Sequence, residues 1–189
     1  MLFRNGDTLA VPPDYIFEPI VETLLLNVYR LDQPMDGRVV VDIGASIGDF
    51  AVAATQTSDV RLYAYEPSFG AFTYLQSNLK QNRREHAWLF NDAAGSRTLG
   101  SILSAHHETC IDFLKVDCEG CEYAVLLGCP DEILAKVKRI SMEIHEIWKH
   151  GRGEILTKLS MAGFRIRQVQ TIGGGHYVYA IRTLSARSA

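Results

Sequence analysis

The chain of 189 residues has no apolar run that approaches the roughly twenty residues a membrane-spanning helix needs. Its first residues also lack the apolar segment of a secretory signal. Neither sign of charge dominates, since 19 lysines and arginines stand against 22 aspartates and glutamates, for a net charge of −3. The composition therefore shows no strongly basic footprint for nucleic acid, although it leaves room for a local basic patch. We expect a cytoplasmic protein without membrane contact, and nucleic acid is an unlikely partner.

Cysteine is scarce, and all of it falls within one stretch, at Cys110, Cys118, Cys121 and Cys129. Cys118 and Cys121 form a C-x-x-C, but a zinc signature needs a second closely spaced pair. Free cysteines in a reducing cytosol behave as small hydrophobic residues. We therefore prefer buried thiols to a metal site, and stoichiometric zinc in the purified protein would contradict this preference.

Two nucleotide-binding glycine patterns are also absent from the stretch V-V-V-D-I-G-A-S-I-G-D, at 39–49. Its β-branched run, followed by an acid and small residues, predicts a buried parallel strand, a tight turn and the start of a helix. A dinucleotide fingerprint would need glycine at all three of Gly44, Ser46 and Asp49, and no P-loop lysine follows. Gly44 and Gly48 still let a ligand lie against bare main chain. S-adenosylmethionine, which has a carboxylate, a positive centre and a ribose but no phosphate, fits this turn beside Asp42.

A second acid follows about twenty residues after the turn, where the second strand of a strand–helix–strand unit ends. The apolar run Arg61–Tyr65 ends in Glu66 and Pro67, so Glu66 is placed to accept hydrogen bonds from two ribose hydroxyls. The alternative is that Asp42 and Glu66 merely end strands. A third short strand is predicted at 87–90. Asn91 or Asp92 after it could meet an adenine amino group, although a turn explains both equally well.

The rest of the chain alternates predicted helices and strands. Tyr15–Tyr29 has apolar residues at helical spacing and is expected either to cover a sheet edge or to act as a lid. Further helices are predicted at 69–81, 122–127 and 153–162, whereas 97–109 is predicted to be a loop. Strands predicted at 164–170 and 177–182 are too close in sequence for a crossover helix, so they must form an antiparallel hairpin. The pattern predicts an α/β sandwich whose last strand is reversed.

A lysine lies inside the apolar strand predicted at 111–118. If helices cover both faces of this strand, Lys115 is buried and needs a partner. The next predicted strand, 139–144, contains Glu143 in an otherwise apolar run. We predict a Lys115–Glu143 ion pair beneath the site, with a catalytic lysine as the alternative.

Four motifs give the chain a family resemblance. They are V-V-D-I-G-A-S-I-G at 40–48, Y-E-P at 65–67, D-F-L-K-V-D-C-E-G-C-E at 112–122 and M-E-I-H at 142–145. With these motifs the chain resembles class I S-adenosylmethionine-dependent methyltransferases, and more narrowly the FkbM family, from about Val39 to Arg182. The third motif is the most specific. Ser46 stands where the family often has asparagine, and Cys118 and Cys121 replace small aliphatic residues, but neither departure affects cofactor binding.

The resemblance implies a three-layer α/β sandwich with a Rossmann-like, seven-stranded, mostly parallel sheet and an antiparallel C-terminal hairpin strand. The methyltransferase domain would span 38–183, after an N-terminal arm and helix at 1–37 and before a tail at 184–189. Asp42 and the glycine turn would line the methionine part of the cofactor, Glu66 its ribose, Asn91 or Asp92 its adenine, and Asp117 the mouth near the methyl group. The implied cofactor-binding set is Asp42, Gly44, Ala45, Ser46, Gly48, Glu66, Pro67, Asn91, Asp92 and Asp117.

Methyl transfer to a hydroxyl requires alignment of the acceptor and removal of its proton. The predicted catalytic residues are Asp117 and Glu119 after one strand and His145 after the next. His145 is the first choice as base because histidine titrates in the useful range, with a structural histidine as the alternative. The three could instead hold a divalent ion that orients a diol, although we assign no metal.

FkbM-like enzymes resemble O-methyltransferases of sugars and natural products, so a small hydroxylated acceptor is the first hypothesis. An RNA methyltransferase and a non-catalytic S-adenosylmethionine-binding module are the alternatives. The short chain has no obvious substrate domain, so the N-terminal helix, a loop or the second subunit of a homodimer would shape the acceptor pocket.

Overall fold

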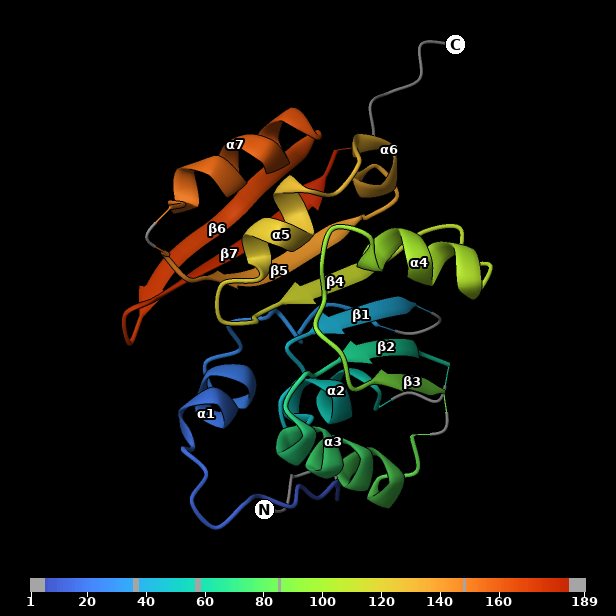
Figure 1. Ribbon diagram of the computed structural model, residues 1–189. Helices are drawn as coiled ribbons and strands as arrows, with labels where there is room; N and C mark the ends of the chain where they lie inside the picture. The colour runs from blue at the N-terminus through green and yellow to red at the C-terminus, as the bar shows by residue number, and fades with distance from the viewer. Residues whose placement is uncertain (1–5, 36–37, 57–58, 85, 148, 184–189) are drawn as a thin grey trace. The chain divides into compact units, whose positions relative to one another are not determined.

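The computed structural model describes residues 6–35, 38–56, 59–84, 86–147 and 149–183 (Figure 1). The chain forms two compact units, which meet in sequence between Ala94 and Gly95. The predicted tail at 184–189 lies outside the described residues, and the predicted domain boundaries stay a prediction. Among the described residues, no helix combines the length and the apolar character needed to cross a bilayer.

The first unit is built on three parallel strands in the order β3, β2, β1. These are β1 (Val39–Ile43), β2 (Arg61–Tyr65) and β3 (Ala87–Phe90), with the helices α1 (Glu18–Leu24), α2 (Asp49–Ala54) and α3 (Phe69–Gln81). Every residue of β1 is buried, as its β-branched apolar run predicts, and the buried residues include Asp42. Helix α3 buries Phe72, Leu75 and Leu79, which recur at helical spacing.

The second unit contains the remaining four strands, in the order β4, β5, β7, β6. These are β4 (Phe113–Val116), β5 (Arg139–Ile144), β6 (Phe164–Ile172) and β7 (Gly175–Arg182), with the helices α4 (Thr98–Ala105), α5 (Glu122–Leu127), α6 (Asp131–Leu134) and α7 (Arg152–Met161). Strands β4 and β5 are parallel, whereas β7 is antiparallel to both β5 and β6. Strands β6 and β7 form the predicted hairpin, joined by Gly173 and Gly174.

The seven strands have the sheet order β3-β2-β1-β4-β5-β7-β6. The pairs β1–β2, β2–β3 and β4–β5 are parallel, whereas both pairs that involve β7 are antiparallel. The predicted Rossmann-like α/β fold, mostly parallel with a reversed last strand, is therefore confirmed.

Two predictions about helices were wrong. Residues 97–109 were expected to be a loop, but Thr98–Ala105 form α4, which buries Leu99, Ile102 and Leu103. The helix expected at Tyr15–Tyr29 is shorter, because α1 runs only from Glu18 to Leu24 and the chain turns after it at Asn27, which has a positive φ of 52°. Apolar spacing in the sequence did not show where this helix ends.

The N-terminal arm is held against α3 by two asparagines. Asn78 is fully buried, and its side-chain amide accepts from Ala10 N at 2.6 Å while donating to Ala10 O at 3.0 Å. Asn82 makes the same pair of hydrogen bonds with Thr8. Its side-chain oxygen accepts from Thr8 N at 2.8 Å, and its side-chain nitrogen donates to Thr8 O at 2.7 Å. Asn78 also donates to Ile47 O at 2.8 Å, so one side chain joins the arm to the turn after β1.

The preference for free thiols at the C-x-x-C was wrong. Cys118 and Cys121 form a disulfide, whereas Cys110 and Cys129 are free and Cys129 is buried as expected. The turn between the paired cysteines has positive φ values at Glu119 (55°) and Gly120 (103°), and it brings the two cysteine Cα atoms to 5.4 Å. That separation is within the usual range for a disulfide.

Candidate functional site

The turn after β1 has the backbone that its glycines predict. Gly44 and Gly48 have positive φ values of 79° and 91°, in the region that favours glycine. The N–H groups of Gly44 and Ala45 both donate to Tyr65 O at 3.0 Å, which ties the turn to the end of β2. A Cβ on Gly48 would lie 2.8 Å from Leu75 Cδ1, so α3 packs directly against the turn. Asp42, fully buried on β1, comes just before it.

Glu66 connects this turn to the end of β2. Its two carboxylate oxygens accept the N–H groups of Ser46 at 2.8 Å and Ser68 at 2.7 Å, and the residue is 8% exposed. An ionised carboxylate offers about four acceptor positions, so two N–H donors leave room for further hydroxyl donors. Asn91 donates to Glu66 O at 2.8 Å and to Pro67 O at 3.1 Å, which fastens the end of β3 to the same corner.

The first unit therefore brings together the predicted residues of the turn with Glu66, Pro67 and Asn91. Asp92 is next to Asn91 and exposed, and its side chain accepts from Ala93 N at 2.8 Å. Burial, and to a lesser degree the charge of Asp92, raises the pKa of the Tyr65 hydroxyl. Tyr15 of the arm was not among the predicted site residues, yet its hydroxyl lies 3.2 Å from Ser46 Oγ.

The predicted catalytic residues belong to the second unit, where β4 and β5 end. Asp117 follows β4, and His145 follows β5. One possible ligand atom each of Asp117, Glu143 and His145 lies within 4.8 Å of the others. Lys115 is 4% exposed, and its Nζ is 3.6 Å from Asp117 Oδ2. Lys115 therefore forms an ion pair with Asp117, while the Lys115–Glu143 ion pair stays a prediction.

His145 is surrounded by carboxylates. Its Nδ1 lies 2.8 Å from Oε1 of Glu122, which is fully buried at the start of α5. Its Nε2 lies 3.6 Å from Glu119 Oε2 and 3.7 Å from Glu143 Oε1. The hydrogen bond to Glu122, aided by the three negative charges and opposed by burial, raises the pKa of His145 to about 9. Without a bound cation this raised pKa favours the imidazolium, so the ring must lose a proton before it can act as a base or bind a metal ion.

Glu122, the last acid of the D-x-E-G-x-E segment, was not among the predicted site residues. Besides contacting His145, Glu122 Oε1 accepts from Cys118 N at 3.2 Å, so one oxygen fixes both the histidine and the disulfide turn. The signal was present in the sequence, since an acid at the first position of a helix that follows a glycine turn is a recognisable pattern.

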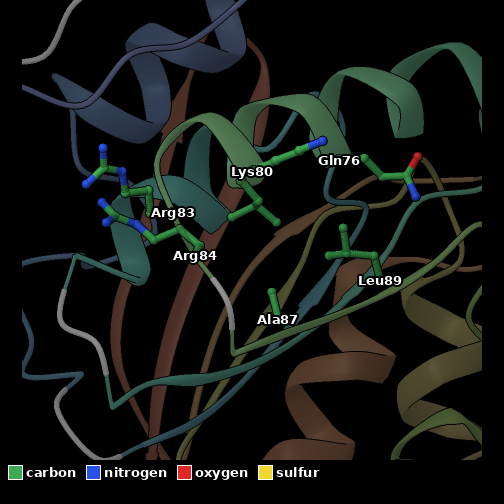
Figure 2. Close-up of a pocket in the computed structure, with 7 residues that line it drawn as sticks. Gln76, Lys80, Arg83, Arg84, Ala87 and Leu89 are labelled. Carbon is green, nitrogen blue, oxygen red and sulfur yellow. The ribbon is translucent and has the colours of Figure 1, made fainter.

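Two surface cavities lie away from these residues. In the first unit, a cavity of about 410 Å³ between α3 and β3 is lined by Gln76, Leu79, Lys80, Arg83, Arg84, Ala87 and Leu89. Figure 2 shows its basic side chains coming from the end of α3 and the residues just after it, with Ala87 and Leu89 on the strand. The other, in the second unit, lies between α4 and the start of α6. Neither is lined by a residue of the predicted site.

Comparison with known proteins supports one class. Residues 93–166 match the family model of the methyltransferase FkbM domain. No curated protein matches the chain. Among solved structures, a precorrin-6y C5,15-methyltransferase from Geobacter metallireducens is 16% identical, with a TM-score of 0.62 over 93% of this chain and 94% of that one.

Two further solved structures belong to methyltransferases of other types. An S-adenosylmethionine-dependent O-methyltransferase from Thermotoga maritima is 15% identical, with a TM-score of 0.59 over 96% of this chain and 69% of that one. An rRNA methylase from Streptococcus thermophilus is 15% identical, with a TM-score of 0.63 over 84% of this chain and 95% of that one. Likenesses at this level of identity establish the fold, which is that of class I methyltransferases.

The FkbM match confirms the predicted family resemblance over residues 93–166. It contains the motifs at 112–122 and 142–145, while those at 40–48 and 65–67 precede it. The match over residues 93–166 and the class I methyltransferase fold together support an S-adenosylmethionine-dependent methyltransferase.

Proposed function

We propose that the chain methylates a hydroxyl oxygen of a small acceptor, with the cofactor bound by the turn after β1 and by Glu66. The observation that carries this proposal is the carboxylate of Glu66, which two main-chain N–H groups hold at 2.8 and 2.7 Å beside a glycine turn. A carboxylate fixed in this way is preorganised to accept both hydroxyls of a ribose. Gly44 and Ser46 are partly exposed, so main chain is accessible beside it.

S-adenosylmethionine supplies a methyl group made electrophilic by its sulfonium. The acceptor oxygen forms a bond to the methyl carbon, the carbon–sulfur bond breaks with its electron pair going to sulfur, and the hydroxyl proton must go to a base. We propose Asp117, Glu119 and His145 as the residues that handle this proton. Glu119 is the most exposed of the three, with a side chain 89% exposed, and is therefore the most accessible to an incoming acceptor.

Replacing each of the three in turn identifies the base. Asp117→Asn, Glu119→Gln and His145→Ala variants would be assayed with labelled cofactor against a panel of sugars and natural-product alcohols. Loss of a general base lowers turnover by about 10²- to 10⁴-fold. For His145→Ala and Glu119→Gln the affinity for the cofactor should stay nearly unchanged, whereas Asp117 is also a predicted cofactor contact. A residue whose variant keeps full turnover is not the base. If none of the hydroxylated acceptors is methylated by the wild-type chain, the acceptor class is wrong.

RNA methylation is the second candidate, and the basic cavity of Figure 2 favours it. Lys80, Arg83 and Arg84 line this one cavity, although Arg84 is paired with Asp7 at 2.6 Å. Phosphate contacts make affinity fall steeply with salt, in proportion to the number of charges involved. RNA binding that weakens with salt, and that Lys80→Ala and Arg83→Ala reduce, would favour this candidate over a small acceptor.

A further inference from the structure

We propose that Asp117, Glu143 and His145 bind a divalent metal ion of the kind that accepts mixed oxygen and nitrogen ligands, such as Mn²⁺ or Zn²⁺. The three residues come from the ends of two neighbouring parallel strands of the second unit. One possible ligand atom from each lies within 4.8 Å of the other two, and Glu143 Oε1 is 3.7 Å from His145 Nε2. A small inward movement of the side chains would bring all three within the roughly 2 Å bonds of a single ion.

The strand register explains why these side chains converge. Val116 on β4 is level with Met142 on β5, so the next residues, Asp117 and Glu143, are level in turn. Neighbouring parallel strands are about 4.8 Å apart, and side chains at the same level point to the same face. His145 is two residues beyond Glu143 and therefore continues on that face.

The orientation of His145 is the second observation. Its Nδ1 is held by Glu122 Oε1 at 2.8 Å, which turns Nε2 toward Glu143. A histidine whose other ring nitrogen is fixed by a carboxylate is the arrangement found at protein metal sites, where that carboxylate sets the tautomer. Glu122 is fully buried, and its Oε2 has no hydrogen-bond partner within the described residues. A buried carboxylate of this kind is stabilised by a nearby cation.

The hairpin fixes Glu143 from the other side. A Cβ added to Gly175, at the start of β7, would overlap Glu143 Oε1 and lie 3.0 Å from Tyr177 Cε2. A larger residue at this position would require the Glu143 carboxylate to move. With glycine there, the carboxylate lies 3.7 Å from Nε2 of His145.

The ligand types indicate the metal. Two carboxylates and one imidazole suit Mn²⁺, Fe²⁺ or Zn²⁺ better than Ca²⁺ or Mg²⁺, which prefer oxygen alone. Three protein ligands leave coordination positions that the oxygens of a hydroxylated acceptor can occupy. That role in orienting the acceptor rests on the proposed function, whereas metal binding itself does not.

The test is direct binding of Mn²⁺ to the full chain after chelator treatment, followed by electron paramagnetic resonance. Mn²⁺ is chosen to avoid binding at Cys118 and Cys121. If their disulfide were reduced, the thiolates would bind softer metals such as Zn²⁺ in preference to Mn²⁺. We expect one Mn²⁺ per chain, and pulsed spectra of the wild-type protein should show coupling to an imidazole nitrogen. Absence of saturable binding, or of the nitrogen coupling, overturns the proposal without reference to any variant.

Variants then separate coordination from general attraction to acids. Asp117→Asn and Glu143→Gln should each weaken Mn²⁺ binding more than about tenfold, because ligand loss exceeds the tenfold or greater cost of losing an outer-shell partner. The matched control is Glu119→Gln, which removes the same charge 3.6 Å from His145 Nε2 but from an exposed side chain. It should change the affinity less than about threefold, since exposed charges contribute little.

Equal weakening in all three variants would mean that only the negative field attracts the ion, and the proposal would be wrong. Circular dichroism verifies that each variant is folded. The proposed function is tested separately by methyl transfer in a strong chelator. Turnover that persists there without Mn²⁺ binding leaves the methyltransferase proposal standing and removes the metal. Mn²⁺ binding without methylation of any hydroxylated acceptor would leave the metal site standing and remove the proposed acceptor class.

Discussion

Replacing Glu122 with glutamine would measure how strongly the second unit depends on the charge of His145. In the folded chain the pKa of His145 rises from 6.5 to about 9, and the hydrogen bond to Glu122 is the largest cause. Each pKa unit corresponds to about 1.4 kcal/mol, so the imidazolium contributes on the order of 3 kcal/mol to the free energy of unfolding. The His145 side chain is 23% exposed, which leaves solvent a minor screening role.

The sign of the pH dependence follows from the direction of the shift. Because the pKa of His145 is raised on folding, its stabilisation is complete below pH 6.5, falls as the pH rises toward 9 and is lost above that value. The free energy of unfolding of the wild-type chain, measured with urea in the presence of a chelator, should exceed that of Glu122→Gln by most at pH 6. The difference should shrink steadily between pH 6.5 and 9.

A matched control comes from a second histidine–acid pair. His150 Nδ1 lies 3.0 Å from Glu154 Oε2 on the surface, so Glu154→Gln removes a similar hydrogen bond where solvent competes. Exposed pairs contribute little, and this variant should follow the wild-type curve at every pH. If the wild-type and Glu122→Gln curves ran parallel from pH 6 to 10, the Glu122–His145 pair would not control the charge of the ring.

Two further substitutions test the first unit. Gly48→Ala forces a positive φ of 91° on alanine and places its Cβ 2.8 Å from Leu75 Cδ1, so we expect a loss of at least about 1 kcal/mol and weaker cofactor binding. Thermal unfolding and calorimetry measure both, and an unchanged variant would mean that the turn is not tightly packed. Asn78→Ala removes two bonds to Ala10 and one to Ile47, which at about 1 kcal/mol each predicts a loss of roughly 3 kcal/mol in urea unfolding. A loss below 1 kcal/mol would show that the arm does not depend on this side chain.

The sequence predicted the strands and most helices well because their boundaries coincide with abrupt changes of residue type. The bounds of α3, β3, α5 and β5 match the predicted ranges, since apolar residues at a regular period end there in polar residues or glycine. Helix α4 was missed because Gly100, Ser101 and Ser104 dilute its apolar spacing, and only packing shows that Leu99, Ile102 and Leu103 are buried together.

Some residues of the candidate site could likewise be predicted from local sequence, and others could not. Residues of the turn and Glu66 follow from local sequence, because one strand end and its glycines determine the geometry. The surroundings of His145 do not, because they depend on strand register and on the disulfide turn, which bring Glu122 and Glu143 to opposite nitrogens of the ring. Such contacts arise between segments that are distant in sequence, so the local pattern that marks Glu122 does not show that it meets His145.

The central claim is that the turn after β1 and Glu66 hold S-adenosylmethionine. Isothermal titration calorimetry of the full chain with S-adenosylmethionine and with its demethylated product tests it most directly. We predict binding of one molecule per chain, weakened about tenfold or more by Glu66→Gln because the anionic acceptor of the ribose hydroxyls is lost. Uptake of a pyridine dinucleotide instead, or equal affinity in the Glu66→Gln variant, would contradict the account.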